Sequence, residues 1–238
     1  GSEMCIRDSD KGIRGIVIKL GNMLRHFYEA EDLLVFGSGY SLALASYKAM
    51  ECGKTGMEFA VGIPGSIGGA VYMNAGAYDG EMQNIVNCVK VMDLQGNERV
   101  LTAEELNFGY RKTSLQNSGL IVTEVTLKMP SGNKDEIKSK MDDFSHRRIS
   151  KQPLEMPSAG SMFKRPPGYF AGTLIDQAGL KGYTVGGAQI STKHAGFVVN
   201  VGGATAADVL QLIKDVQTKI KAGVGVELQP EVLVIGEE

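Results

Sequence analysis

The sequence has few of the residues that form covalent cross-links or metal sites. Its three cysteines, Cys5, Cys52 and Cys88, lie far apart and form no C-x-x-C pair, and there are only three histidines. This scatter argues against a disulfide framework or a zinc site and is typical of a reducing compartment. No apolar run is long enough to cross a bilayer, and the N-terminus lacks the apolar segment of a signal peptide. We therefore expect a soluble cytoplasmic protein with no metal site and no membrane partner.

An excess of charge of one sign is also lacking. The chain has 25 lysine and arginine residues against 27 aspartate and glutamate residues, with a formal net charge of −2. Proteins that bind nucleic acids usually carry a basic face, so we expect no nucleic-acid partner. A small acidic ligand is compatible with this balance, because it needs only a local cluster of arginine and lysine.

Glycine, in contrast, is abundant. The chain has 31 glycines, a share roughly twice the average, and they gather at turns between apolar runs. Glycine is required where the backbone takes positive φ or approaches another group closely. This abundance suits a protein that wraps its backbone around a bulky ligand.

Apolar alternation and turn residues predict strands and helices without strict strand–helix–strand repetition, which indicates an α+β fold. The expected strands span residues 15–20, 33–37, 85–93, 99–101, 120–129, 195–201 and 231–236. The expected helices are residues 42–50, a short helix after the capping box Thr102-x-x-Glu105, a longer one burying Ile137, Met141 and Phe144, and residues 170–178 and 206–221. For the last helix we expect Thr205 as N-cap and Gly223 just past its end.

Two prolines divide the chain into two expected lobes. Pro153 and Pro157 predict an extended linker, so we place one lobe at residues 10–149 and a second at residues 150–238. Residues 1–9 show no periodicity, and we expect them to be a tag or an unrelated segment.

The segment Gly62–Ala70 (GIPGSIGGA) is the clearest ligand-binding candidate. Its four glycines, proline and serine would expose successive backbone N–H groups at a helix N-terminus, which can hold a pyrophosphate. A tight structural turn explains the same residues equally well. The following Asn74-Ala75-Gly76-Ala77-Tyr78 is polar and small, as a ligand-facing turn would be.

Three further residues are candidates for chemistry, although each has an ordinary explanation. Arg111 could be a solvated surface residue, Ser161 a turn residue and Glu231 an exposed carboxylate at a strand edge. They lie 50 and 70 positions apart, so only the fold could bring them together.

A family resemblance decides between these alternatives. The runs GIPGSIGGAVYMNAGAYDGE, FGYRKTSL, PSAGSMFKRP and ELQPEVLVIGE, in this order, resemble the UDP-N-acetylenolpyruvoylglucosamine reductase (MurB) family, in its shorter subtype. The resemblance covers about residues 11–236. It implies an FAD-binding lobe of the PCMH (vanillyl-alcohol-oxidase) type, followed by a substrate-binding α+β lobe. It also implies reduction of UDP-N-acetylglucosamine enolpyruvate to UDP-N-acetylmuramate, with FAD and NADPH, in peptidoglycan precursor synthesis, and we expect a monomer.

The resemblance assigns roles to matching positions. Arg111 would hold the substrate carboxylate, Glu231 would help to polarise it, and Ser161 would donate the proton. The residues implied to bind FAD are Gly62, Ile63, Pro64, Gly65, Ser66, Gly68, Gly69, Ala70, Asn74, Gly76, Ala77 and Tyr78. Those implied to lie near the UDP-sugar are Tyr110, Lys151, Lys164, Arg165 and Gly187.

One departure from the family pattern leaves alternatives open. The family has a further stretch before residue 15 with a Gly-Gly-Gly-Ser-Asn-like loop, which is not found here, so we expect an incomplete FAD-binding lobe. An alternative is therefore a truncated, flavin-free fragment that binds a nucleotide sugar without activity. Another flavin oxidase of the same superfamily is disfavoured, because the glycine-rich region holds no histidine or cysteine for covalent flavin attachment.

Overall fold

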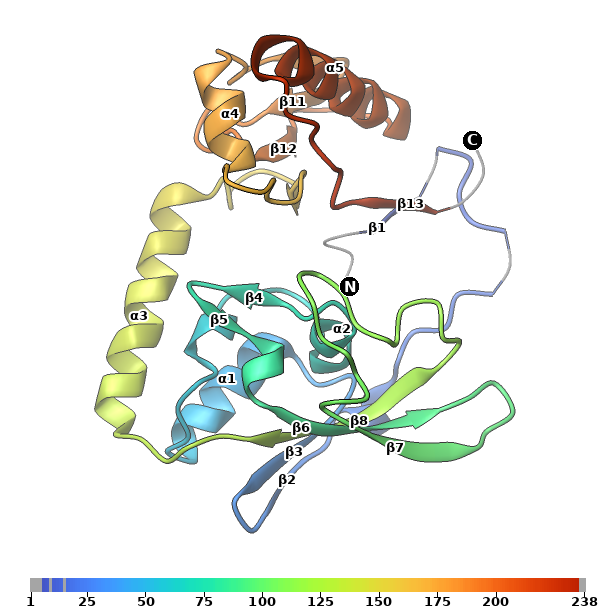
Figure 1. Ribbon diagram of the computed structural model, residues 1–238, viewed down its shortest axis with the longest axis vertical. Coiled ribbons are helices and arrows are strands. Elements are labelled where there is room, and N and C mark those ends of the chain that lie inside the picture. Colours follow the sequence, from blue (N-terminus) through green and yellow to red (C-terminus); the bar gives the residue numbers. More distant parts are fainter. Residues whose placement is uncertain (1–5, 9, 15, 236–238) are drawn as a thin grey trace. The chain divides into compact units, whose positions relative to one another are not determined.

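The computed structural model describes residues 6–8, 10–14 and 16–235, and it divides them into two compact units (Figure 1). The first unit holds residues 18–147. The second holds residues 148–235 together with the described residues up to Val17. The division thus falls two residues before the expected one, and residues 10–17 group with the second unit instead of the first. The α+β class expected from the sequence is confirmed.

A five-stranded antiparallel sheet forms the base of the first unit. In spatial order its strands are β2 (Phe27–Ala30), β3 (Leu33–Gly37), β8 (Ile121–Lys128), β6 (Val86–Met92) and β7 (Glu98–Thr102). Val125 and Leu127 of β8 and Met129 just after it are buried, so the alternation predicted for 120–129 is confirmed at these positions. The predictions for 33–37, 85–93 and 99–101 are confirmed as well.

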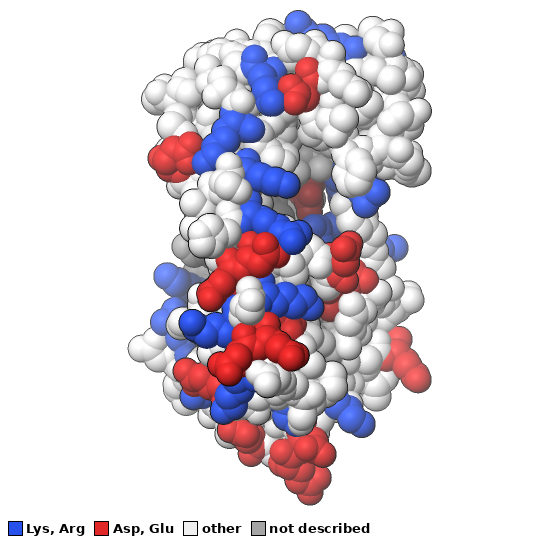
Figure 2. All heavy atoms as spheres, turned by 90° about the vertical axis from the view of Figure 1, so that its left-hand side faces the viewer, with Lys and Arg blue, Asp and Glu red and all other residues white. Residues whose placement is uncertain are grey.

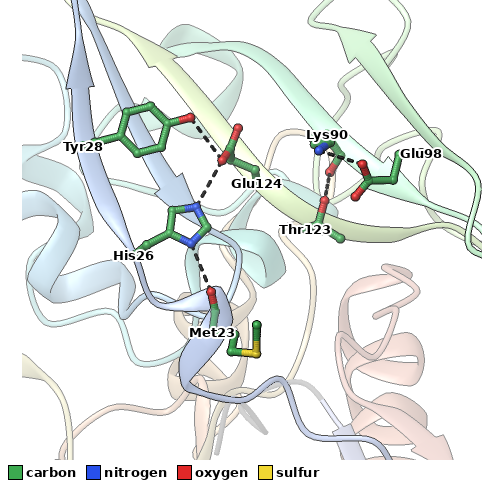
Figure 3. A network of polar contacts seen from close by, with 7 residues as sticks. All are labelled: Met23, His26, Tyr28, Lys90, Glu98, Thr123 and Glu124. Carbon is green, nitrogen blue, oxygen red and sulfur yellow. Dashed lines mark hydrogen bonds and ion pairs between the residues drawn. The ribbon is translucent and has the colours of Figure 1, made fainter.

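The other face of this sheet carries a polar network (Figure 3). Glu124 on β8 lies 3.1 Å from His26 Nε2 and accepts a hydrogen bond of 3.3 Å from the Tyr28 hydroxyl. Lys90 on β6 pairs with Glu98 at 2.7 Å. Such contacts join edge strands to central strands, although exposed pairs of this kind add at most about 1 kcal/mol each.

Short helices cover the buried face of the sheet. They are α1 (Leu42–Glu51), η2 (Glu58–Ala60), α2 (Ile67–Tyr72) and η3 (Met82–Asn84), beside a small hairpin of β4 (Gly76–Ala77) and β5 (Gly80–Glu81). A further short helix, η1 (Asn22–Leu24), precedes β2 and has no buried residue. Ser41 caps α1 by accepting from the Leu44 N–H, and the buried side chains include Phe36, Leu42 and Ile67. The expected helix over 42–50 is confirmed.

Two local predictions in the first unit are wrong. In the strand expected over 15–20, Gly15 lies outside the described residues and residues 16–20 form no strand. Ile16 is 92% exposed, because an apolar run becomes a strand only where a neighbour pairs with it. The Thr102–Glu105 capping box forms both of its hydrogen bonds, at 2.8 and 3.3 Å, but no helix follows it. Asn107 takes a left-handed φ of 44°, which ends the turn before a helix can continue.

Helix α3 (Lys134–Lys151) runs across the division between the units. Ile137, Met141 and Phe144 are buried on one face, as predicted. Figure 2 shows lysine, arginine, aspartate and glutamate side chains intermingled on the side of the molecule that this helix occupies. Among them are the pairs Lys138–Asp142 at 3.8 Å and Arg147–Asp143 at 2.7 Å. The exposed face of α3 is therefore a solvated helix face with balanced charge.

The second unit packs two helices on a four-stranded antiparallel sheet. Its strands, in spatial order, are β10 (Thr184–Val185), β11 (Ala188–Ile190), β12 (Phe197–Asn200) and β9 (Ser158–Ser161). The helices are α4 (Ala171–Gln177) and α5 (Ala206–Val224), and β1 (Ile6–Asp8) pairs in parallel with β13 (Leu233–Ile235). Strand β9 was not predicted, and Ser161 was considered as a turn residue. The predictions for 170–178, 195–201 and 231–236 are confirmed, except that Gly236 lies outside the described residues.

Helix α5 begins at the residue that the sequence predicts and ends three residues later than predicted. Thr205 and Asp208 form a reciprocal capping box, with bonds of 3.1 and 2.9 Å. Asp10 adds a carboxylate that accepts from the N–H groups of Ala206 and Ala207 at 2.7 and 3.2 Å. The C-cap is Gly225 at φ 73°, so the prediction that Gly223 follows the helix is wrong. Within the described residues, no helix has the length and apolar character needed to span a membrane.

Candidate active site

The segment Gly62–Ala70 forms a loop up to the N-cap Ser66 and continues as the first four residues of α2; it is called the loop Gly62–Ala70 below. Gly62 and Gly65 have φ values of 70° and 122°, which only glycine adopts readily. Gly65 accepts a hydrogen bond of 3.0 Å from the Leu42 N–H at the start of α1. A Cβ on Gly68 would lie 2.7 Å from the Ser38 Cβ, so the loop packs directly on the turn after β3.

The first amide groups of α2 are already bonded within the chain. The Ile67 N–H donates to Tyr40 O and the Gly68 N–H donates to Ser38 O, both at 2.9 Å. The Gly69 N–H donates to the Ser66 hydroxyl at 3.3 Å. These three amides are therefore not available to a pyrophosphate, and the assignment of Gly62–Ala70 to FAD stays a prediction. What the loop offers instead is exposed backbone without side chains at Gly62 and Gly69.

Glu58, which the sequence analysis did not select, is a buried acidic residue of η2, shortly before this loop. Its carboxylate is 3% exposed and accepts from the Thr55 hydroxyl at 2.6 Å and the Gly56 N–H at 2.8 Å. Burial alone would raise the pKa of Glu58, but these hydrogen bonds and the charge of Lys140 outweigh it and lower the pKa. The available signal was an acidic residue inside the otherwise apolar run MEFAV.

Glu58→Gln is expected to destabilise the protein at neutral pH by about 1–3 kcal/mol, the usual contribution of hydrogen bonds to a charged group. Because the folded-state pKa lies below the unfolded value of about 4.3, ionisation of Glu58 adds stability above that pH. This contribution disappears as the pH falls through the folded-state pKa. Between about pH 7 and pH 3, the free energy of unfolding measured with urea should therefore fall less for Glu58→Gln than for wild type. An exposed control, Glu104→Gln, should follow the wild-type curve, and a Glu58→Gln curve parallel to it would contradict this prediction.

The turn after α2 engages most of its side chains within the first unit. Asn74 is 1% exposed, so its side chain is not available to a ligand as the sequence suggested. Tyr78 stacks on Phe144 of α3, with ring centroids 4.5 Å apart. A Cβ on Gly76 would lie 2.7 Å from Gly80 O, so glycine is needed there for hairpin packing.

Arg111 lies in a strained turn next to this segment. It has a left-handed φ of 53°, which is unusual for a residue with a long side chain. Its guanidinium donates to Gly76 O at 3.2 Å and to Asn74 O at 3.5 Å, and it lies 5.3 Å from the centre of the Tyr110 ring. Non-glycine residues in such conformations concentrate at functional sites. The guanidinium is therefore held in a defined place at a partly exposed position.

Ser161 and Glu231 are brought together in the second unit. Ser161 ends β9, is exposed and donates to Phe163 O at 3.3 Å. The Glu231 N–H donates to Met162 O at 2.9 Å, and Phe163 pairs with Pro230 in an antiparallel bridge. These backbone contacts place a serine hydroxyl and a carboxylate on neighbouring segments. Arg111 belongs to the first unit.

The residues implied to lie near the UDP-sugar differ in their exposure. Tyr110, Lys151 and Arg165 are exposed and Lys164 is half-buried. The Arg165 guanidinium lies 3.9 Å from the centre of the Phe170 ring. Gly187 is buried, and a Cβ there would overlap Gly202 O and Ala204 N, so close packing rather than ligand contact explains this glycine. Among the described residues, no group of three histidine, cysteine or acidic side chains could hold a metal ion.

Comparison with known families matches two parts of the chain. Residues 152–235 match the C-terminal domain family of UDP-N-acetylenolpyruvoylglucosamine reductase, and residues 1–102 match the FAD binding domain family. Because the second match begins at residue 1, it includes the nine residues that were expected to be unrelated.

Similar proteins cover nearly the whole chain. The UDP-N-acetylenolpyruvoylglucosamine reductase of Clostridium perfringens (strain SM101 / Type A) is 50% identical over 238 residues, which is 100% of this chain and 77% of that protein. The one from Caldanaerobacter subterraneus subsp. tengcongensis is 48% identical, over 97% of this chain and 76% of that protein. The crystal structure of the reductase MurB from Thermus caldophilus matches with a TM-score of 0.83 and 38% identity, covering 97% of this chain and 85% of that chain.

Proposed function

Because the chain belongs to the UDP-N-acetylenolpyruvoylglucosamine reductase family, we propose that it reduces the enolpyruvyl ether of UDP-N-acetylglucosamine to UDP-N-acetylmuramate. The observation that carries this proposal is the 50% identity over the full 238 residues, which spans both matched domains. The reaction uses FAD as the bound cofactor and NADPH as the reductant, and its product is a precursor of peptidoglycan.

The residues that would hold FAD lie in the first unit. The loop Gly62–Ala70 fits a bulky cofactor, because it is anchored to α1 and to the turn after β3 and exposes backbone at Gly62 and Gly69. A Cβ on Gly69 would meet only the Ser66 hydroxyl oxygen, at 3.4 Å, so there is open space beside it. When bound, FAD supplies the hydride that it has received from NADPH. The contribution of the loop is then shape and close approach rather than an anion-binding helix terminus.

Three residues of this chain would act on the substrate. Addition of a hydride to an alkene that bears a carboxylate builds negative charge on that carboxylate. Arg111 would hold the carboxylate and stabilise this charge, and Glu231 would polarise the same group. The Ser161 hydroxyl would deliver the proton to the neighbouring carbon. A serine hydroxyl is a weak acid, so close placement against a strongly basic carbon is required.

Positive charge in the second unit suits the nucleotide part of the substrate. Lys151, Lys164 and Arg165 would lie near the UDP-sugar, with Tyr110 contributed by the first unit. The Arg165 guanidinium lies over the Phe170 ring, which restricts its position. Gly187 has a packing role in place of the substrate contact first assigned to it. A monomeric state, a cytoplasmic location and the absence of a nucleic-acid partner stay predictions of the sequence.

The visible absorption spectrum of the purified protein tests the proposed function. We expect a visible flavin absorption band that NADPH bleaches and that the enolpyruvyl substrate restores. The restoration by substrate is the decisive step, because other flavoproteins are also bleached by NADPH. A colourless protein that takes up no added FAD would instead identify the flavin-free nucleotide-sugar-binding fragment.

A further inference from the structure

We propose that Asn74 is a positioning residue that fixes the Arg111 guanidinium in the first unit. The inference rests on the proposed role of Arg111 in holding the substrate carboxylate. Asn74 follows α2 and is 1% exposed, so its side chain acts on the protein and not on a ligand. Both residues and all their contacts discussed below belong to the same unit.

The Asn74 side chain clamps the turn that carries Arg111. Its Nδ2 donates to Gly109 O and to Glu81 Oε2, each at 3.0 Å. Its Oδ1 accepts the Gln83 N–H at 3.0 Å. A carbonyl can only accept and a backbone N–H can only donate, so these bonds fix which side of the amide carries the nitrogen. The side chain is therefore locked in one orientation.

The clamp acts at the carbonyl that closes the turn. The Gly109 N–H donates to Lys112 O at 2.9 Å, and the Lys112 N–H donates to Gly109 O at 3.1 Å. Gly109 O thus accepts from both Lys112 and Asn74. Arg111 lies inside this closed turn with its φ of 53°, and a conformation of that kind persists only where surrounding contacts hold it. The bond from Asn74 is such a contact.

The backbone of Asn74 holds the other end of Arg111. The guanidinium donates to Asn74 O at 3.5 Å and to Gly76 O at 3.2 Å. One residue therefore fixes the turn through its side chain and the charged group through its carbonyl. A shift of Asn74 would therefore move both the backbone turn that carries Arg111 and the Arg111 guanidinium.

The position requires the chemistry of asparagine. Asn74 has a left-handed φ of 45°, which asparagine, aspartate and glycine tolerate best. Its contacts need two donors and one acceptor on a short side chain. Aspartate would keep the conformation and the acceptor, but it would place a second carboxylate against Glu81 and leave Gly109 O without this donor. Glycine would keep the conformation and lose every side-chain contact.

Asn74→Asp and Asn74→Gly test this inference, with Asn107→Asp as the matched control. Asn107 has a φ of 44° in the same unit, but its side chain is exposed. In the Asn74 variants we expect reoxidation of the bound flavin by substrate to slow by about ten- to a hundredfold, the usual effect of misplacing a reacting group. Bleaching by NADPH should keep its wild-type rate. Asn107→Asp should change neither rate.

Hydrogen exchange of the 109–112 turn gives a readout that needs no bound cofactor. We expect its amides to exchange faster in both Asn74 variants and to keep the wild-type rate in Asn107→Asp, as measured by mass spectrometry. Asn74→Asp combined with Arg111→Ala should slow reoxidation no further than Arg111→Ala alone, because Asn74 acts through Arg111.

Wild-type reoxidation in the Asn74 variants, or a full additional loss in the Arg111→Ala background, would overturn the inference. If Arg111→Ala itself leaves reoxidation intact, it is the proposed role of Arg111 that fails, whereas faster exchange of the turn still reports the clamp. If Asn74→Asp yields no folded protein, the same criteria apply to Asn74→Gly, which adds no charge.

Discussion

Ser161→Ala is expected to slow substrate-dependent reoxidation of the bound flavin by about 10²- to 10⁴-fold, the range typical of a lost proton donor. Bleaching of the flavin by NADPH should proceed at the wild-type rate, because it does not need this proton. The fold should tolerate the change, since Ser161 is exposed and its hydroxyl makes one 3.3 Å bond to Phe163 O. Stopped-flow absorbance separates the two half-reactions.

Ser158→Ala is the matched control on the same strand. The Ser158 hydroxyl donates to Val198 O at 2.9 Å and accepts the Gly160 N–H at 3.1 Å, so it joins β9 to β12. Its loss should lower the free energy of unfolding by about 1 kcal/mol and leave reoxidation at the wild-type rate. Ser161 would lose its assignment as proton donor if Ser161→Ala reoxidised as fast as wild type.

Gly187→Ala is expected to lower the free energy of unfolding by about 3 kcal/mol, at the upper end of the usual overpacking range. The added Cβ would overlap Gly202 O and Ala204 N and lie 2.7 Å from the Ala204 Cα. All three atoms are backbone, so no side chain can rotate away to make room. The affected turn leads directly to Thr205, the N-cap of α5, which is the longest helix of the second unit. Urea unfolding followed by circular dichroism measures the loss.

Gly223→Ala is expected to raise the free energy of unfolding, whereas Gly187→Ala is expected to lower it. Gly223 lies inside α5, and a Cβ there would meet nothing within 4 Å. Alanine should therefore stabilise the helix by up to about 1 kcal/mol. A loss below about 1 kcal/mol in Gly187→Ala would show that the backbone at Gly202 can shift, and the packing explanation for this glycine would be wrong.

The sequence predicted those elements that bury one face. Strands β3, β6 and β8 and helices α3 and α5 show apolar periodicity because each packs on a core, and their positions were correct within a few residues. Residues 16–20 have a similar apolar composition but no strand partner, and composition alone cannot report pairing. Strand β9 was missed for the opposite reason. Its residues Ser-Ala-Gly-Ser have no apolar pattern, and only pairing with β12 makes them a strand.

The candidate site depends on contacts that no local pattern contains. Ser161 and Glu231 are neighbours because the segment after β9 pairs with the segment before β13, at a separation of about 70 residues that a sequence period cannot reveal. Asn74 was selected for its polar, glycine-rich surroundings and was interpreted as a ligand contact. Its partner Gly109 lies 35 positions away, so its place in the support of Arg111 follows only from the fold.

The internal hydrogen bonds of the loop Gly62–Ala70 also bear on the thermodynamics of cofactor binding. The amides of Ile67, Gly68 and Gly69 and the carbonyl of Gly65 are satisfied by the protein itself. The loop therefore has its ordered conformation before any ligand arrives, and binding does not have to remove backbone entropy there. Preorganisation of this kind raises affinity by reducing the ordering cost of association rather than by adding contacts.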